Sequence, residues 1–177
     1  MKKTLLILLI VFFTFSICLY AQELNLTGTW KLDLEKSQLP QMGNRAPQAR
    51  ETTLIIEQED NVIKIETVTT TQRGERKSAM SLVIGGGETK VESPMGGRRP
   101  SQGAGAPART PSAALAKAEL SKDGKSLVIT TTTQRGDFSS ITTSTYTISK
   151  DGKILTEKQT RTFGDRESES VLVYNKV

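Results

Sequence analysis

The amino-acid sequence predicts an all-β fold whose strands follow one another in antiparallel order. From Thr27 onward, runs rich in Thr, Val and Ile alternate with short segments that contain Gly or Asp, which is typical of strands and hairpins. After the N-terminal apolar run, only Ala113–Leu120 approaches the 3.6-residue apolar period of a helix, and its alternating alanines fit a strand about as well. Connections of a few residues can join only antiparallel neighbours, which indicates an up-and-down meander.

The expected strands can be placed one by one. In Gly28–Leu34, Trp30 and Leu32 share one face, while Lys31 and Asp33 share the other. Glu88–Glu92, which follows a run of three glycines, is a candidate for a short extra strand. The remaining expected strands are Thr53–Gln58, Val62–Gln72, Arg76–Ile84, Ala113–Leu120, Lys125–Gln134, Phe138–Ser149, Lys153–Phe163 and Ser168–Val177.

Two segments rich in Pro and Gly interrupt this pattern and are predicted to be long loops, at residues 37–49 and 93–112. The second carries Arg98 and Arg99 without an acidic residue beside them. These arginines could bind an anionic head group through charge-assisted hydrogen bonds. The alternative, which the composition of the loop favours, is that they only keep a Pro- and Gly-rich segment soluble.

The N-terminus has the three-part layout of a secretory signal peptide. Lys2 and Lys3 precede an apolar run over 5–15, which is shorter than a membrane-spanning helix needs, and Ala21 offers a small residue for cleavage. We therefore expect 1–21 to be a signal peptide and 22–177 to form one domain that is periplasmic or secreted. Lipidation at Cys18 is not expected, because the bulky Ile17 precedes it.

Composition excludes several kinds of chemistry. The chain has no histidine, and its single cysteine, Cys18, would leave with the signal peptide. Ser-His-Asp and Cys-His catalytic sites and the usual zinc and copper sites are thereby ruled out. Because most acids stand at expected turns or on polar strand faces, we expect no enzyme, no metal and no cofactor. Loss of Lys2 and Lys3, with no acid in 1–21, lowers the formal charge from +5 to +3, which does not favour nucleic acid as a partner.

The first expected strand carries the most specific motif. Gly28-x-Trp30, in the run Gly28–Asp33, resembles the opening of lipocalins and more closely that of bacterial secreted lipocalin-like domains. The repeated Asp-Gly-Lys turns at 123–125 and 151–153 and the apolar last strand at 171–177 are similar too, so the likeness spans most of the expected mature chain. The resemblance implies an antiparallel barrel of about eight to ten strands with Trp30 near its closed end. It also implies an Arg on that Trp, either Arg161 or Arg166.

These observations lead to an expected function as a binding protein. If the short strand at 88–92 exists, the up-and-down order places both long loops at the same end of the barrel, where they would suit a ligand entrance. A small apolar or amphipathic ligand would contact inward apolar residues, and the alternative is an interaction or structural module with a filled core. We expect a monomer with no transmembrane segment in the mature chain. The predicted ligand-binding residues are Trp30, Ile65, Met80, Leu82, Leu127, Ile129, Tyr146, Arg98 and Arg99.

Overall fold

The described residues form ten antiparallel strands, which confirms the predicted all-β class. The computed structural model describes residues 24–39, 51–71, 74–92, 113–135 and 138–177. The predicted signal peptide, most of the first predicted loop, and the second loop with Arg98 and Arg99 lie outside the described residues. The strands are β1 (Gly28–Gln38), β2 (Glu51–Glu59), β3 (Val62–Thr71), β4 (Gly74–Val83), β5 (Thr89–Glu92), β6 (Ala113–Leu120), β7 (Ser126–Arg135), β8 (Phe138–Ile148), β9 (Ile154–Phe163) and β10 (Arg166–Lys176).

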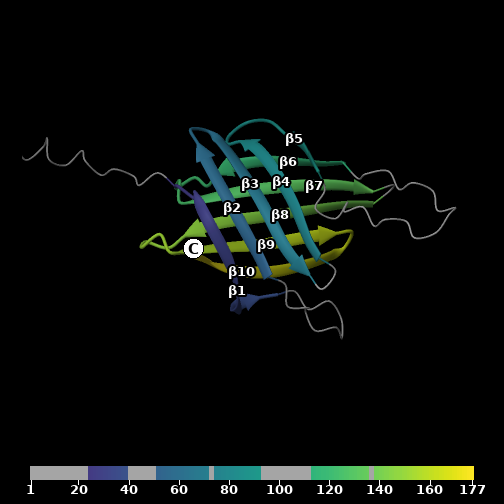
Figure 1. Cartoon of the computed structure of the whole chain (residues 1–177). Coiled ribbons are helices and arrows are strands. Elements are labelled where there is room, and N and C mark those ends of the chain that lie inside the picture. Colours follow the sequence, from purple (N-terminus) through teal and green to yellow (C-terminus); the bar gives the residue numbers. More distant parts are fainter. Residues whose placement is uncertain (1–23, 40–50, 72–73, 93–112, 136–137) are drawn as a thin grey trace, which may run out of the picture.

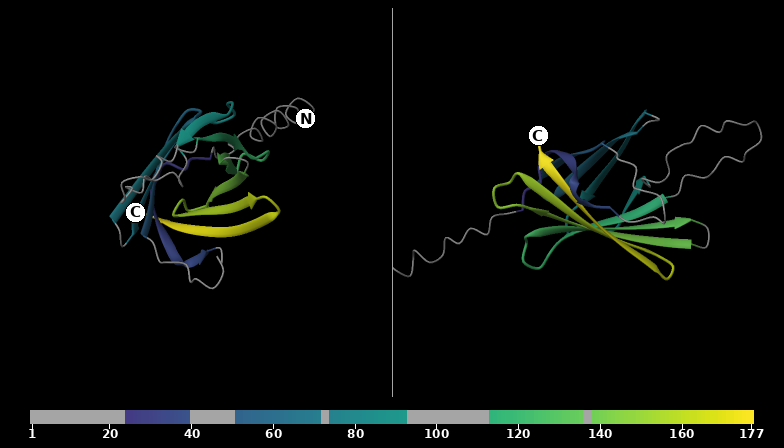
Figure 2. Two further views of the ribbon diagram at one scale, coloured as in Figure 1. Left: turned by 90° about the vertical axis from the view of Figure 1, so that its right-hand side faces the viewer. Right: turned by 90° about the horizontal axis from the view of Figure 1, so that it is seen from below.

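The strands form one sheet that curls into a near-closed barrel, in the order β4-β3-β2-β1-β10-β9-β8-β7-β6-β5. The first and last strands pair directly, with Trp30 opposite Lys176. Between β4 and β5 the ladder is interrupted, and the barrel is joined there by a parallel bridge between Ile84 and Ala118. In Figures 1 and 2, β1–β4 form one side of the barrel and cross β6–β10, which form the other.

The short strand β5 exists, and this decides how the two ends of the barrel are built. Because strand directions alternate from β1 to β10, the strand ends that flank 40–50 and 93–112 lie at the same end. We call this the open end. The opposite, closed end carries the connections at 60–61, 84–88, 121–125 and 149–153.

The closed end is filled by apolar side chains. Trp30 is fully buried, and its Nε1 donates to the backbone oxygen of Leu26 over 3.0 Å. Leu26 is also fully buried, and Gln58 binds the segment that carries it through Nε2 to the Leu24 oxygen, over 2.9 Å. The residues just before β1 therefore lie against the base of the barrel and cover it. The largest fully buried side chains are Trp30, Tyr174, Leu26, Ile56, Ile63, Leu82, Leu127 and Leu155.

Two connections at the closed end repeat the same hydrogen-bonded turn. In the second, Ser149 Oγ donates to Asp151 Oδ1 over 2.5 Å, and the backbone N–H of Lys153 donates to the same oxygen over 3.2 Å. Gly152 adopts φ 69°, a left-handed conformation that favours glycine. The connection at 121–125 has the same bonds at the same distances. The Asp-Gly-Lys motif seen in the sequence is thus a turn signal rather than a ligand site.

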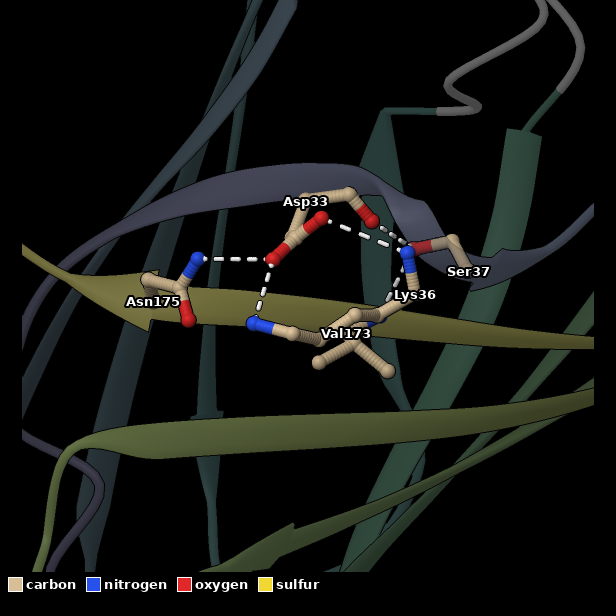
Figure 3. Close-up of polar contacts among 5 residues, drawn as sticks. All are labelled: Asp33, Lys36, Ser37, Val173 and Asn175. Atoms are coloured by element: carbon tan, nitrogen blue, oxygen red, sulfur yellow. Dashed lines mark hydrogen bonds and ion pairs between the residues drawn. The ribbon is translucent and has the colours of Figure 1, made fainter.

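At the other end of β1, an irregularity lets the strand leave the regular ladder. Asp33 pairs with Val173 but Gln38 pairs with Val171, so the intervening residues of β1 form a bulge. Ser37 closes it, because its Oγ donates to the Asp33 oxygen over 2.6 Å and accepts from the Val173 N–H over 2.9 Å (Figure 3). The Asp33 carboxylate accepts from Asn175 Nδ2 over 3.0 Å and lies 2.8 Å from Lys36 Nζ.

Candidate binding site in the barrel interior

The inward faces of the strands change character along the barrel. Near the closed end they carry Ile, Leu and Trp, whereas toward the open end they carry mainly Ser and Thr. Strand alternation assigns these side chains to the inner face. In the ladders they lie opposite other residues of that face, whereas the outward lysines and glutamates lie opposite residues of the outer face. The inward hydroxyl residues toward the open end are Thr52, Thr67, Thr69, Ser78, Thr131, Thr133, Ser140, Thr142, Ser144, Ser168 and Ser170.

Solvent reaches the upper part of this interior. A side chain that points into a filled core is normally buried, yet Thr67, Ser78, Thr131 and Thr142 are only half-buried. Inward apolar residues next to them are half-buried too: Leu32, Met80 and Leu172 pack against the core without being enclosed by it. The interior therefore has an apolar base and a hydroxyl-rich upper part, which is accessible at Thr67, Ser78, Thr131 and Thr142 and buried at Ser140, Ser144 and Ser170.

Seven of the nine predicted ligand-binding residues lie in this interior, and their inward placement follows from the pairing of strands. Six of them are buried, and Met80 is half-buried. Arg98 and Arg99 lie outside the described residues. The seven described residues are Trp30, Ile65, Met80, Leu82, Leu127, Ile129 and Tyr146. Their contact with a ligand remains a prediction.

A buried carboxyl stands among these residues. Glu157 on β9 is 5% exposed, and three hydroxyls from the two neighbouring strands donate to it. Ser144 Oγ and Tyr146 OH, both on β8, reach Oε1 over 2.8 Å and 3.0 Å, while Tyr174 OH on β10 reaches Oε2 over 3.1 Å. We call Ser144, Tyr146, Glu157 and Tyr174 the Glu157 cluster.

Burial of the Glu157 cluster makes ionisation of its carboxyl less favourable. Desolvation raises the pKa of Glu157 above its usual value, and the hydrogen bonds from Ser144, Tyr146 and Tyr174 oppose that rise because they stabilise the charged form. Burial and the nearby carboxylate also raise the pKa of Tyr146 and of Tyr174, so both phenols stay protonated and act as donors.

Above the cluster, toward the open end, β9 continues with polar inward residues. Gln159 Nε2 lies 3.5 Å from Ser144 Oγ. Arg161 Nε donates to Ser140 Oγ over 3.2 Å, and Ser140 is opposite Phe163 in the ladder, near the open end of β9. The Nε atom of Arg161 thus bonds to a residue that lies one inward position nearer the open end than Arg161 itself.

At the closed end, the expectation of an arginine on Trp30 is wrong. Lys176 supplies the cation, with Nζ 5.2 Å from the centre of the Trp30 ring. Arg161 lies opposite Ser168, eight residues along β10 from the Lys176 that pairs with Trp30, which is about 27 Å at the usual rise of a strand. Arg166 lies farther still along β10. A Cβ on Gly28 would come within 2.9 Å of Lys176 Cε, so the glycine of the Gly-x-Trp motif leaves room for that lysine.

A separate open groove of about 340 Å³ lies on the barrel wall formed by β2–β4. Most of its lining points outward, including Glu57, Lys64 and Glu66. Ile65 and Met80, which were predicted to contact a ligand, border it from their strands. The Glu157 cluster lies on the other side of the barrel, so the groove is distinct from the candidate site.

Sequence reasoning missed Glu157, because it treated the acids as residues of turns and polar faces. In β9 both faces mix apolar and polar residues, so alternation alone does not identify the inner one. The signal that could have revealed it was register, since a hairpin that buries Tyr146 and Leu155 together brings Glu157 opposite Tyr146.

Neither a metal centre nor a membrane helix is found in the described part of the chain. Within residues 24–39, 51–71, 74–92, 113–135 and 138–177, no group of three or more Cys, Asp and Glu side chains is placed to hold a metal ion. The regular structure of these residues is strand, and no helix among them is long and apolar enough to cross a membrane.

By class, the described part of the chain is an antiparallel, near-closed β-barrel of ten strands. Its sequence matches no protein-family model and none of the curated proteins searched. Among solved structures, it is similar to secretory abundant heat soluble protein 4 from Ramazzottius varieornatus, with 13% identity and a TM-score of 0.48 over 86% of this chain and 94% of that one. It is also similar to zebrafish ileal bile acid-binding protein complexed with cholic acid, with 14% identity and a TM-score of 0.49 over 85% and 98% of the two chains.

Proposed function

We propose that this protein is an exported, non-enzymatic binding protein that carries a small amphipathic ligand inside its barrel. The observation that carries the proposal is the division of the inner surface. An apolar base and half-buried apolar residues such as Met80 and Leu172 can receive the apolar part of a ligand. The accessible hydroxyls above them can bind its polar part, which is the usual composition of a small-molecule site.

Export and family are part of the same proposal. The basic start, short apolar run and Ala21 support a cleaved signal peptide and a periplasmic or secreted location. The Gly28-x-Trp30 opening supports a place among bacterial secreted lipocalin-like domains. N-terminal sequencing of the exported protein is expected to begin at Gln22, and an intact Met1 in the exported fraction would contradict cleavage.

Native mass spectrometry of the protein purified from its own periplasm or culture medium tests the carrier function. A small molecule retained at one equivalent per chain is the expected result and would identify the ligand class. A matched pair of variants tests whether the retained molecule binds inside the barrel. Thr142→Phe fills the interior and should abolish retention, while Thr143→Phe changes the outer face of the same strand and should leave retention unchanged. A clean mass without adduct, repeated after incubation with a lipid extract, would favour an interaction module with a filled core.

A further inference from the structure

We infer that the ligand carries a protonated amine, which Glu157 recognises inside the barrel. This inference rests on the proposed carrier function and narrows it to one chemical class, small amphipathic amines. Four properties of the Glu157 cluster support it: the absence of a cationic partner within the described residues, spare acceptor capacity, aromatic neighbours and access from the interior.

The first property concerns charge. The ion pairs among the described residues join side chains at the protein surface, and Glu157 belongs to none of them. The inward cation on its own strand is Arg161, four residues away, or about 14 Å at the usual strand rise. Its Nε donates to Ser140, toward the open end. A buried carboxylate without a counter-charge is costly, and a cationic ligand would supply that counter-charge.

The second property is the distribution of donors over the two carboxylate oxygens. Oε1 accepts from two hydroxyls, whereas Oε2 accepts from Tyr174 alone. An ionised carboxyl can accept about four hydrogen bonds. Oε2 can therefore accept an ammonium N–H without displacing a protein donor, and such a charge-assisted bond is roughly twice as strong as a neutral one.

The surroundings of that oxygen suit an amine joined to an apolar chain. Tyr146 and Tyr174, whose hydroxyls donate to the carboxyl, bring aromatic side chains to the wall around it. Leu172, which lies opposite Glu157 in the ladder, is half-buried, as is Gln159, the next inward residue of β9. Solvent thus reaches the positions next to Glu157, and Leu172 and Met80 offer apolar surface for the rest of the molecule.

The same geometry argues against an anionic or a neutral head group at this position. A carboxylate or phosphate ligand would be repelled by the ionised form of Glu157, and a neutral alcohol would supply no counter-charge to that form. By contrast, Arg98 and Arg99 of the predicted second loop would favour a ligand with an anionic head group. A comparison of ligands that share one apolar chain therefore separates the two expectations.

Isothermal titration of the full chain at neutral pH with n-octylamine, 1-octanol and octanoate makes that comparison. We expect octylamine to bind at least about tenfold more tightly than octanol, as one charge-assisted hydrogen bond provides. Glu157→Gln should remove that preference and leave octanol binding unchanged, which also shows that the variant barrel is folded. Glu169→Gln, on the outer face of β10 and exposed, is the matched control and should change none of the three affinities.

The outcomes are distinct. Octylamine that binds no more tightly than octanol or octanoate to the unmodified chain overturns the amine inference while the carrier function stands, and this comparison needs no variant. Equal octylamine affinity in Glu157→Gln also overturns it. If none of the three compounds binds, the amine inference fails together with the carrier function proposed above.

Discussion

Tyr174 on β10 donates its hydroxyl to Glu157 on β9 across 3.1 Å, at a point where both side chains are buried. Because Ser144 and Tyr146 donate to the same carboxyl from β8, Glu157 joins three consecutive strands through side chains as well as through the ladder. Its charge state should therefore be coupled to the stability of the barrel.

The first prediction concerns the pH dependence of stability. Burial raises the pKa of Glu157 above its ordinary value of 4.5. A group whose pKa is raised by folding contributes stability that is complete below the unfolded pKa and is lost as the pH rises through the folded pKa. The free energy of unfolding of the native protein, measured against Glu157→Gln, should thus fall as the pH rises above 4.5, by about 1.4 kcal/mol for each unit of the shift.

Urea unfolding of both proteins across pH 4 to 9 measures this difference. Glu157→Gln keeps the shape of the side chain and removes its titration, so groups common to both proteins cancel. The ionisable groups that face Glu157 are Tyr146 and Tyr174, whose raised pKa keeps them neutral over this range. A difference that stays constant with pH would show that Glu157 titrates as an ordinary glutamate.

The second prediction concerns the phenol donors. Replacing Tyr146 or Tyr174 with Phe removes a hydrogen bond that favours the charged carboxyl, so the pKa of Glu157 should rise further. At high pH, where the carboxylate is charged, each substitution should cost about 1.5–3 kcal/mol, and at low pH it should cost less. Urea unfolding across the same pH range measures the cost at both ends. An equal cost at low and high pH would contradict the prediction that the phenol stabilises the charged carboxylate.

The third prediction concerns the repeated turn. Gly152 has φ 69°, and a Cβ there would contact nothing within 4 Å, so only backbone strain opposes a larger residue. Gly152→Ala should destabilise the protein by about 1–2 kcal/mol. Gly87→Ala is the control, because that position is equally open but has no positive φ, and it should be neutral or slightly stabilising. Equal effects of the two substitutions in chemical unfolding would refute the strain.

Much of the fold could be predicted from local sequence. Thr- and Val-rich runs and short Gly- and Asp-containing turns gave the strands, their antiparallel order and the extra strand β5. The interruption between β4 and β5 could not be predicted, because it depends on how far a curled sheet closes and not on a local pattern. The irregularity after Asp33 was missed for a similar reason. The residues of β1 that form it, Asp33 and Ser37, are held by bonds from Asn175 and Val173 on β10, more than a hundred residues away in the sequence.

For the candidate site, alternation was sufficient to place the apolar inward residues but not the polar ones. Trp30 and Leu82 stand in strands where apolar and polar residues alternate, and large apolar residues on an inner face are normally buried. Glu157 breaks that rule, because its burial depends on hydroxyls from two other strands. The β8–β9 hairpin register places it opposite Tyr146, but the third donor, Tyr174, comes from β10, and the register of that strand does not follow from strand alternation.

The last prediction tests the bulge of β1. Ser37 Oγ holds two backbone groups at once, the Asp33 oxygen on its own strand and the Val173 N–H on β10. Ser37→Ala would leave the Val173 N–H without its partner in a partly buried position, at a cost of about 1–2 kcal/mol. Ser81→Ala, on the exposed outer face of β4, should change stability by less than about 0.5 kcal/mol. Hydrogen exchange should locate the effect: the Val173 amide should exchange faster in Ser37→Ala, while the Leu155 amide in the neighbouring ladder keeps its protection relative to global unfolding. An unchanged Val173 amide would mean that Ser37 does not hold the bulge in solution.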